Sequence, residues 1–128
     1  MTDNYETDIW LANLFRGWND PCPLGGLEDG KDGLVESWKI NTFVNPPYSN
    51  IMPWVQKAIY ECEQNKIQVV MLLKMDTSTM WFATLKQAGA QFLWINRRLK
   101  HRTNSGASFA SMLAVLTPSE DKKQTRFK

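Results

Sequence analysis

Three segments of the chain place their apolar residues at the spacing of an amphipathic helix, namely residues 11–18, 51–62 and 81–88. The first segment should form a helix of roughly two to three turns. Asp76 or Thr77 is expected to cap the third helix, because either side chain can accept a hydrogen bond from the first-turn backbone N–H groups. The pattern therefore predicts three helices separated by segments of a different period.

Four shorter runs have the composition of β-strands, and they occupy residues 40–44, 67–73, 91–95 and 109–116. The run at 67–73 is almost continuously apolar, as expected for a central parallel strand that is covered on both faces. The last two runs are joined by a polar loop without a helix, so the final strand should be antiparallel to its predecessor. These elements predict an α/β fold with a mixed sheet, a C-terminal antiparallel hairpin and helices on both faces.

The front half of the chain is too short for a complete doubly wound sheet. Only 24 residues lie between Pro21 and Pro46, and much of this stretch is glycine-rich loop. Two further strand-helix units would need about a dozen or more residues for each crossover. A chain of 128 residues is nevertheless long enough for one domain with its own core. We expect residues 1–128 to form a single domain with an abbreviated sheet.

The four residues Asn45-Pro46-Pro47-Tyr48 directly follow the strand predicted at residues 40–44. Each proline lacks a backbone N–H, so the strand must end at Asn45. Proline also favours extended geometry in the residue before it, so the Asn45 amide should project from the strand end. In an open α/β sheet, ligands bind beyond the carboxyl ends of the strands, where an amide and a ring suit a nucleobase. By chemistry alone, a plain Pro-Pro turn with a surface tyrosine explains these residues equally well.

The composition describes an ordinary globular protein, with 43% hydrophobic and 22% charged residues. The sequence has no apolar run long enough to span a bilayer and no signal-peptide pattern, so a cytoplasmic protein without a membrane partner is expected. Cys22 and Cys62 lack metal-ligand spacing, and the single histidine, His101, cannot hold a metal alone. Both cysteines should be reduced thiols, and no metal site is predicted.

The net charge of +2 hides an uneven distribution of charged side chains. Residues 1–36 contain eight acidic and two basic side chains, whereas residues 37–128 contain five acidic and thirteen basic ones. Residues 77–119 contain no acidic side chain at all. A basic cluster in this window is the candidate DNA-binding surface: Arg97, Arg98, Lys100 and Arg102. The alternative is a basic face that only contacts solvent.

Asn-Pro-Pro-Tyr after a hydrophobic strand resembles the catalytic motif of methyltransferases that modify amines with S-adenosylmethionine. That group includes adenine-N6 and cytosine-N4 DNA methyltransferases and glutamine-N5 protein methyltransferases. Across residues 10–116, the order of further residues resembles the small phage-type DNA N-6-adenine methyltransferases of the Dam-like family. These residues are Trp10, Leu14-Phe15, Asn19-Asp20-Pro21-Cys22-Pro23, Asp32-Gly33-Leu34, Trp38, residues 43–48, Trp54, Lys57-Ala58, residues 69–73, Thr77, Trp81-Phe82 and Arg98-Leu99.

The resemblance implies a Rossmann-like methyltransferase fold and site-directed methylation of the N6 amine of adenine in DNA. It implies that the Asn45 side-chain oxygen and the Pro46 carbonyl accept hydrogen bonds from the amine. Pro47 then shapes the turn, and Tyr48 stacks on the base. The amine is buried in a duplex, so the target nucleotide must flip out of the stack. This chemistry requires no catalytic histidine or cysteine.

The S-adenosylmethionine site is expected along Asp20, Pro21, Cys22, Pro23 and Gly25. Glycine lets a backbone approach a ligand closely, and a carboxylate can accept hydrogen bonds from a ribose or bind an ammonium group. Asp20 is the preferred contact, although an ordinary turn aspartate before proline fits the same residues. The chain departs here from the glycine-rich loop with which most such enzymes begin their cofactor site.

Alternatives of other classes stay open. The substrate amine can instead belong to a glutamine side chain or another base. A nucleic-acid-binding remnant would bind DNA without turnover, and a helper subunit would be active only with a partner chain. No added recognition domain fits in this length, so a homo-oligomer or a partner subunit would be needed for extended readout of DNA sequence. If a phage encodes the chain, the expected location is the cytoplasm of the host cell.

Overall fold

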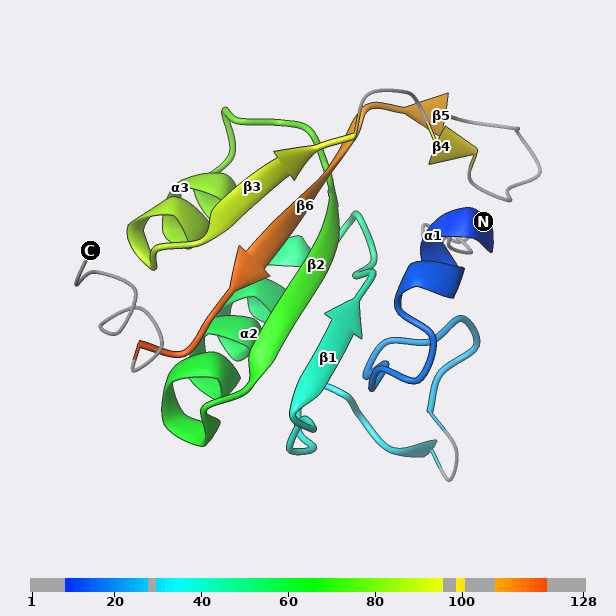
Figure 1. Ribbon diagram of the computed structural model, residues 1–128, viewed down its shortest axis with the longest axis vertical. Helices are drawn as coiled ribbons and strands as arrows, with labels where there is room; N and C mark the ends of the chain where they lie inside the picture. The colour runs from blue at the N-terminus through cyan, green and yellow to red at the C-terminus, as the bar shows by residue number, and fades with distance from the viewer. Residues whose placement is uncertain (1–8, 28–29, 96–98, 101–107, 120–128) are drawn as a thin grey trace.

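The computed structural model describes residues 9–27, 30–95, 99–100 and 108–119. Within them, four strands form one sheet in the order β1-β2-β6-β3, and two short strands form a separate ribbon (Figure 1). The strands of the sheet are β1 (Asn41–Val44), β2 (Gln68–Lys74), β3 (Gln91–Trp94) and β6 (Ser111–Leu116). The helices are α1 (Ile9–Leu14), α2 (Ile51–Asn65) and α3 (Met80–Gln87), and the ribbon consists of β4 (Leu99–Lys100) and β5 (Ser108–Phe109). The predicted α/β class with a mixed sheet is confirmed.

Strand directions place three strand ends at one edge of the sheet. β1 and β2 are parallel, while β6 lies between β2 and β3 and is antiparallel to both. The carboxyl ends of β1, β2 and β3 therefore share one edge, called the carboxyl edge below. The antiparallel C-terminal pair is confirmed, with Leu93 opposite Leu113. The strand predicted at 109–116 is interrupted at Ala110, whose carbonyl accepts a hydrogen bond from the Met75 N–H (2.9 Å).

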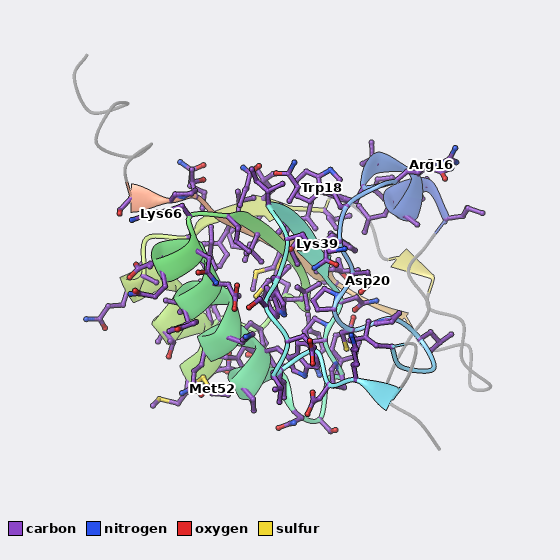
Figure 2. All side chains as sticks on the ribbon, turned by 90° about the horizontal axis from the view of Figure 1, so that it is seen from below. Arg16, Trp18, Asp20, Lys39, Met52 and Lys66 are labelled. Atoms are coloured by element: carbon purple, nitrogen blue, oxygen red, sulfur yellow. The ribbon has the colours of Figure 1, made fainter. Side chains whose placement is uncertain are left out.

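α2 and α3 lie together on one face of the sheet (Figure 2). Successive side chains of a strand point to opposite faces, so Val69, Met71 and Leu73 of β2 belong to the core under these helices. The apolar stripe of α2 meets them with Val55 and Ala58, both fully buried. The continuous apolar run of β2 follows from this burial on both faces.

α1 lies on the opposite face, so the predicted helices on both faces are present. Its Leu11 is buried in a second cluster with Phe43 and Val70. Phe15 follows the helix and stacks on Phe43, with ring centroids 4.4 Å apart. Within the described residues α1 covers six residues, and the chain turns away after it at Gly17, which has a φ of 87°.

α3 begins later than the sequence predicted. Thr79 has extended geometry and its hydroxyl accepts a hydrogen bond from the Phe82 N–H (3.3 Å), so Thr79 is the N-cap. Asp76 instead accepts hydrogen bonds from the hydroxyl and the backbone N–H of Ser78 (2.6 and 3.1 Å), and these lower the pKa of Asp76. The predicted cap at Asp76 or Thr77 was wrong because the Asp76 carboxylate forms a local turn ahead of the helix.

Candidate active site

Residues 45–48 form the connection between β1 and α2. β1 ends at Val44, and Pro46 is buried just beyond it. The Asn50 N–H donates a hydrogen bond to the Pro47 carbonyl (3.1 Å), which closes a turn directly before α2. The two prolines end the strand as their chemistry requires. This places the Asn-Pro-Pro-Tyr segment at the carboxyl edge of the sheet.

The Asn45 and Tyr48 side chains are held against the body of the protein. The Asn45 side-chain oxygen and the Tyr48 hydroxyl are both buried, and the Tyr48 side chain packs against the core cluster under α2. Each residue as a whole is only partly buried. An amide oxygen is a hydrogen-bond acceptor, and an aromatic ring offers a flat apolar face. The role of these two side chains toward a base stays a prediction.

A segment from the N-terminal part of the chain pairs with the outer edge of β1. Asn19 forms a parallel bridge with Thr42. The Asn19 N–H donates to the Asn41 carbonyl, and the Phe43 N–H donates to the Asn19 carbonyl, both at 2.9 Å. The Asn19 side-chain amide also donates to the Thr42 hydroxyl (3.3 Å). Because the bridge is parallel, the chain at Asn19 runs in the same direction as β1, and it bends at residues 21–22 just after the bridge.

Asp20 opens a tight turn at this position. Its carboxylate accepts a hydrogen bond from the Cys22 N–H (3.0 Å). Burial raises the pKa of Asp20, and the hydrogen bond from Cys22 opposes part of that rise. Burial and the nearby Asp20 charge raise the pKa of the Cys22 thiol to about 12, so Cys22 stays protonated at neutral pH. Cys22 of the turn and Tyr48 of the motif both pack against the core cluster under α2.

A cavity of about 620 Å³ opens beside this turn. It is lined by the two turn prolines and by the loop that follows them: Asn19, Pro21, Pro23, Gly26, Leu27, Lys31, Gly33, Glu36, Ser37 and Lys39. A smaller cavity of about 210 Å³ shares the proline and glycine lining and adds Cys22, Asp32 and Trp54. The larger volume lies in the range of small-molecule sites, which is roughly 300–1,000 Å³.

Four of the five predicted cofactor-binding residues line these cavities. Pro21 and Pro23 line both cavities above, and Cys22 lines the smaller one. Asp20 lines a third cavity of about 560 Å³, which also contains Lys39 (Figure 2). Gly25 is not among the residues of the described chain that line these three cavities, and its φ of 87° serves the turn instead.

Sequence reasoning missed most of the residues that line the 620 Å³ cavity. Lys31, Glu36, Ser37 and Lys39 belong to a loop in which ordinary polar side chains follow no recognisable spacing. Gly33 gave a weak signal, because it stands within the Asp-Gly-Leu triplet of the family resemblance. Only the folding of this loop onto the Asp20 turn makes the wall of a cavity from these residues.

Of the four predicted DNA-binding residues, three lie outside the described residues: Arg97, Arg98 and Arg102. Lys100 belongs to β4, and its backbone pairs with that of Ser108 in β5. The β4–β5 ribbon projects from the carboxyl edge, at the end of the sheet where β1 also ends (Figure 1). β3 leads into this ribbon from the far side of the sheet, three strand spacings or about 14 Å from β1.

Other kinds of site find no support in the part of the chain that the structure describes. No group of three or more His, Cys, Asp or Glu side chains is arranged to hold a metal ion there. Cys22 and Cys62 do not form a disulfide. None of the described helices is both long and apolar enough to cross a membrane.

A family model described as DNA N-6-adenine-methyltransferase (Dam) matches residues 27–124. The match covers well over half of the chain and contains residues 45–48. The chain belongs to this family. The Asp20 turn precedes the matched stretch, so its position next to β1 comes from the fold alone.

Two phage proteins, both named DNA N-6-adenine-methyltransferase, are similar to this member of the Dam family. The protein of Escherichia phage T1 is 42% identical over 59 residues, which are 46% of this chain and 24% of the phage protein. The protein of Haemophilus phage HP1 (strain HP1c1) is 38% identical over 63 residues, which are 48% of this chain and 36% of the phage protein. The chain thus matches between about a quarter and about a third of these relatives' length. No solved structure matches it.

Proposed function

We propose that this chain transfers a methyl group from S-adenosylmethionine to the exocyclic N6 amine of adenine at defined sites in DNA. The observation that carries the proposal is the position of residues 45–48 at the carboxyl edge, within the stretch that matches the Dam family. The Asp20 turn directly follows the bridge between Asn19 and Thr42 of β1, and the cavity beside this turn supports a cofactor site. The proposed fold is an abbreviated Rossmann-like methyltransferase fold, in which Asn19 occupies the place of a further parallel strand.

The chemistry assigned to the motif is the orientation of an amine. Asn45 and the Pro46 carbonyl each accept a hydrogen bond from the N6 amine, which turns its lone pair out of conjugation with the ring. The nitrogen becomes nucleophilic without a general base of unusual pKa, and holding it in line provides most of the rate. Tyr48 supplies a face for stacking, and Pro47 keeps the turn rigid.

The larger cavity fits S-adenosylmethionine in both size and chemistry. Its volume of about 620 Å³ suits a small-molecule cofactor. Lys31 and Lys39 offer positive charge for a carboxylate, and Glu36 offers oxygen acceptors for hydroxyl or ammonium groups. When bound, the cofactor supplies an activated methyl group on its sulfonium. Pro21 and Pro23 give this cavity an apolar wall, and the protonated Cys22 thiol, which lines the smaller neighbouring cavity, does not compete for the methyl group.

DNA is the proposed partner, since the N6 amine belongs to a base. Flipping the base out of the duplex costs a few kcal/mol, which stacking and phosphate contacts must offset. The phosphate contacts remain predictions for the basic cluster at 97–102. Both relatives are phage proteins, so we place this activity in the cytoplasm of a host cell.

The direct test is transfer of labelled methyl from S-adenosylmethionine to unmethylated duplex DNA, which is then digested to nucleosides. We expect the label in N6-methyladenine. Asn45→Ala should lower the rate about 10²-fold or more, the usual effect of removing one hydrogen-bonding group from a transition state. Gln64→Ala is the matched control, because Gln64 is an exposed amide near the far end of α2. Its rate should equal that of the unmodified protein.

The same experiment separates the alternatives. Label in another base or in protein would replace the adenine assignment. No label, together with no cofactor binding in calorimetry but normal DNA binding, would replace the enzyme with a DNA-binding remnant. Equal rates for Asn45→Ala and the unmodified chain would remove the motif from the mechanism.

A further inference from the structure

α2 carries a buried carboxylate that the proposed reaction does not use. Glu61 is only 1% exposed, although it stands outside the apolar stripe that the sequence predicts for this helix. An isolated charge in such a position would be strongly destabilising, so its partners must compensate for the lost water. The arrangement of those partners shows what the carboxylate holds in place.

Two partners of Glu61 belong to α2 itself. Lys57, one turn earlier, places its Nζ 2.8 Å from Oε2, and Asn65, one turn later, donates to Oε1 at 2.7 Å. Burial by itself would raise the pKa of Glu61. The hydrogen bonds from Lys57, Asn65 and the Trp38 backbone, together with the Lys57 charge, outweigh burial and lower that pKa. Glu61 is therefore ionised at neutral pH.

The third partner lies outside the helix. The Trp38 backbone N–H donates to Glu61 Oε1 (3.1 Å) from the loop that precedes β1. Trp38 is itself buried and stacks on Trp54 of α2, with ring centroids 6.3 Å apart. Its indole N–H donates to the Gly33 carbonyl (2.8 Å). Trp38 thus connects the Glu61 carboxylate, through its backbone N–H, to the Gly33 carbonyl in the cavity loop, through its indole N–H.

The Gly33 backbone also contacts the turn that begins at Asp20. A Cβ added to Gly33 would lie 1.9 Å from the Pro21 carbonyl oxygen, so the two backbones are in direct contact. Gly33, Pro21 and Ser37 all line the 620 Å³ cavity. The wall of the cavity is therefore set by a continuous series of contacts from Glu61 through Trp38 to Gly33 and Pro21.

We propose that Glu61 is a positioning residue for the cofactor: it anchors the loop at 33–38 against α2 and so sets the shape of the S-adenosylmethionine site. This inference rests on the proposed function for the identity of the ligand. Glu61→Ala removes the acceptor of the Trp38 N–H, and the loop loses its attachment to the helix. Glu61→Gln keeps an acceptor oxygen for the Trp38 N–H but loses the charge and places an NH2 group where Oε2 pairs with Lys57.

The test combines two measurements on folded variants, at a temperature where circular dichroism shows each to be intact. Calorimetry gives the dissociation constant for S-adenosylmethionine, and hydrogen exchange gives the protection of amides 33–38. Glu61→Ala should weaken cofactor binding about tenfold, the equivalent of one charge-assisted hydrogen bond, and should speed exchange in the loop. Glu61→Gln should recover most of both. Glu63→Ala, an exposed glutamate on the same helix, should change neither.

Trp38→Phe provides an independent variant if Glu61→Ala does not fold, because it keeps a ring and removes only the indole donor to Gly33. It should weaken cofactor binding and loosen the loop in the same direction. Unchanged binding and exchange in a folded Glu61→Ala or Trp38→Phe protein would overturn the proposal. Failure of the unmodified chain to bind S-adenosylmethionine would instead count against the proposed function, and the exchange of amides 33–38 would still test the anchor.

Discussion

Replacing Gly33 with alanine tests the contact on which the proposed cofactor site depends. The added Cβ would lie 1.9 Å from the Pro21 carbonyl oxygen and 3.0 Å from a ring carbon of Trp54. The obstructing atoms are backbone and a rigid ring, so one segment must move by about 1 Å to restore a normal contact distance. The φ of Gly33 lies outside the left-handed region, so the backbone conformation itself tolerates alanine.

The expected cost follows from two terms. Overpacking of a well-filled site costs about 1–3 kcal/mol, and loss of the hydrogen bond from the Trp38 indole to the Gly33 carbonyl costs about 0.5–1.5 kcal/mol. We therefore expect Gly33→Ala to lower the free energy of unfolding by about 2–4 kcal/mol, a substantial part of a typical 5–15 kcal/mol. Binding of S-adenosylmethionine should weaken as well, because Gly33 lines the cavity.

Urea unfolding followed by tryptophan fluorescence measures the stability, and calorimetry measures the binding. Gly30→Ala is the matched control: Gly30 has a φ of 67° and no heavy atom within 4 Å of an added Cβ. This variant introduces backbone strain at a positive φ but no clash. Its free energy of unfolding should fall by about 1 kcal/mol or less, because alanine also reduces the conformational entropy of the unfolded chain and so offsets part of the strain. If Gly33→Ala is no less stable than Gly30→Ala and binds the cofactor equally well, the contact with Pro21 does not shape the site.

Two further variants, one pH profile and one labelling experiment test other parts of the structure. Leu85→Ala should destabilise the protein by about 2–5 kcal/mol in urea unfolding, because Leu85 is fully buried between α3 and the sheet. Thr79→Ala should cost about 1 kcal/mol in the same assay, through loss of the α3 cap. Glu61 has a lowered pKa in the folded state. Its contribution to stability is therefore present above the unfolded pKa of about 4.3 and is lost as the pH falls through the folded value. The free energy of unfolding of Glu61→Gln, measured in urea at a series of acid pH values, should therefore depend less on pH than that of the unmodified protein. The pKa of Cys22 is raised to about 12, so a thiol reagent at pH 8 should label Cys22 much more slowly in the folded than in the urea-unfolded chain. Mass spectrometry of the labelled peptide measures the two labelling rates. Equal rates would contradict the burial of Cys22.

The sequence was a good guide where local chemistry decides the structure. Apolar runs of strand-like composition located the strands, a period of 3.6 residues located the helices, and the prolines at 46 and 47 ended β1. The polar loop without a helix correctly predicted that the last strand runs antiparallel to β3. The cap of α3 was missed because Asp76, Thr77 and Thr79 have the same capping chemistry, and only the local turn at Asp76 selects among them.

The sequence by itself thus determined the element types, the mixed sheet and the placement of the Asn-Pro-Pro-Tyr segment at a strand end, since these depend on neighbours a few residues apart. Tertiary structure alone decided which distant segments complete the site. Asn19 meets Thr42, and Trp38 meets Glu61, each across 23 residues of sequence, and neither pair has a periodic signal. Gly33 reaches Pro21 only because the loop folds onto α2. Such contacts arise from the packing of whole elements, where burial and the need to satisfy buried polar groups select one arrangement.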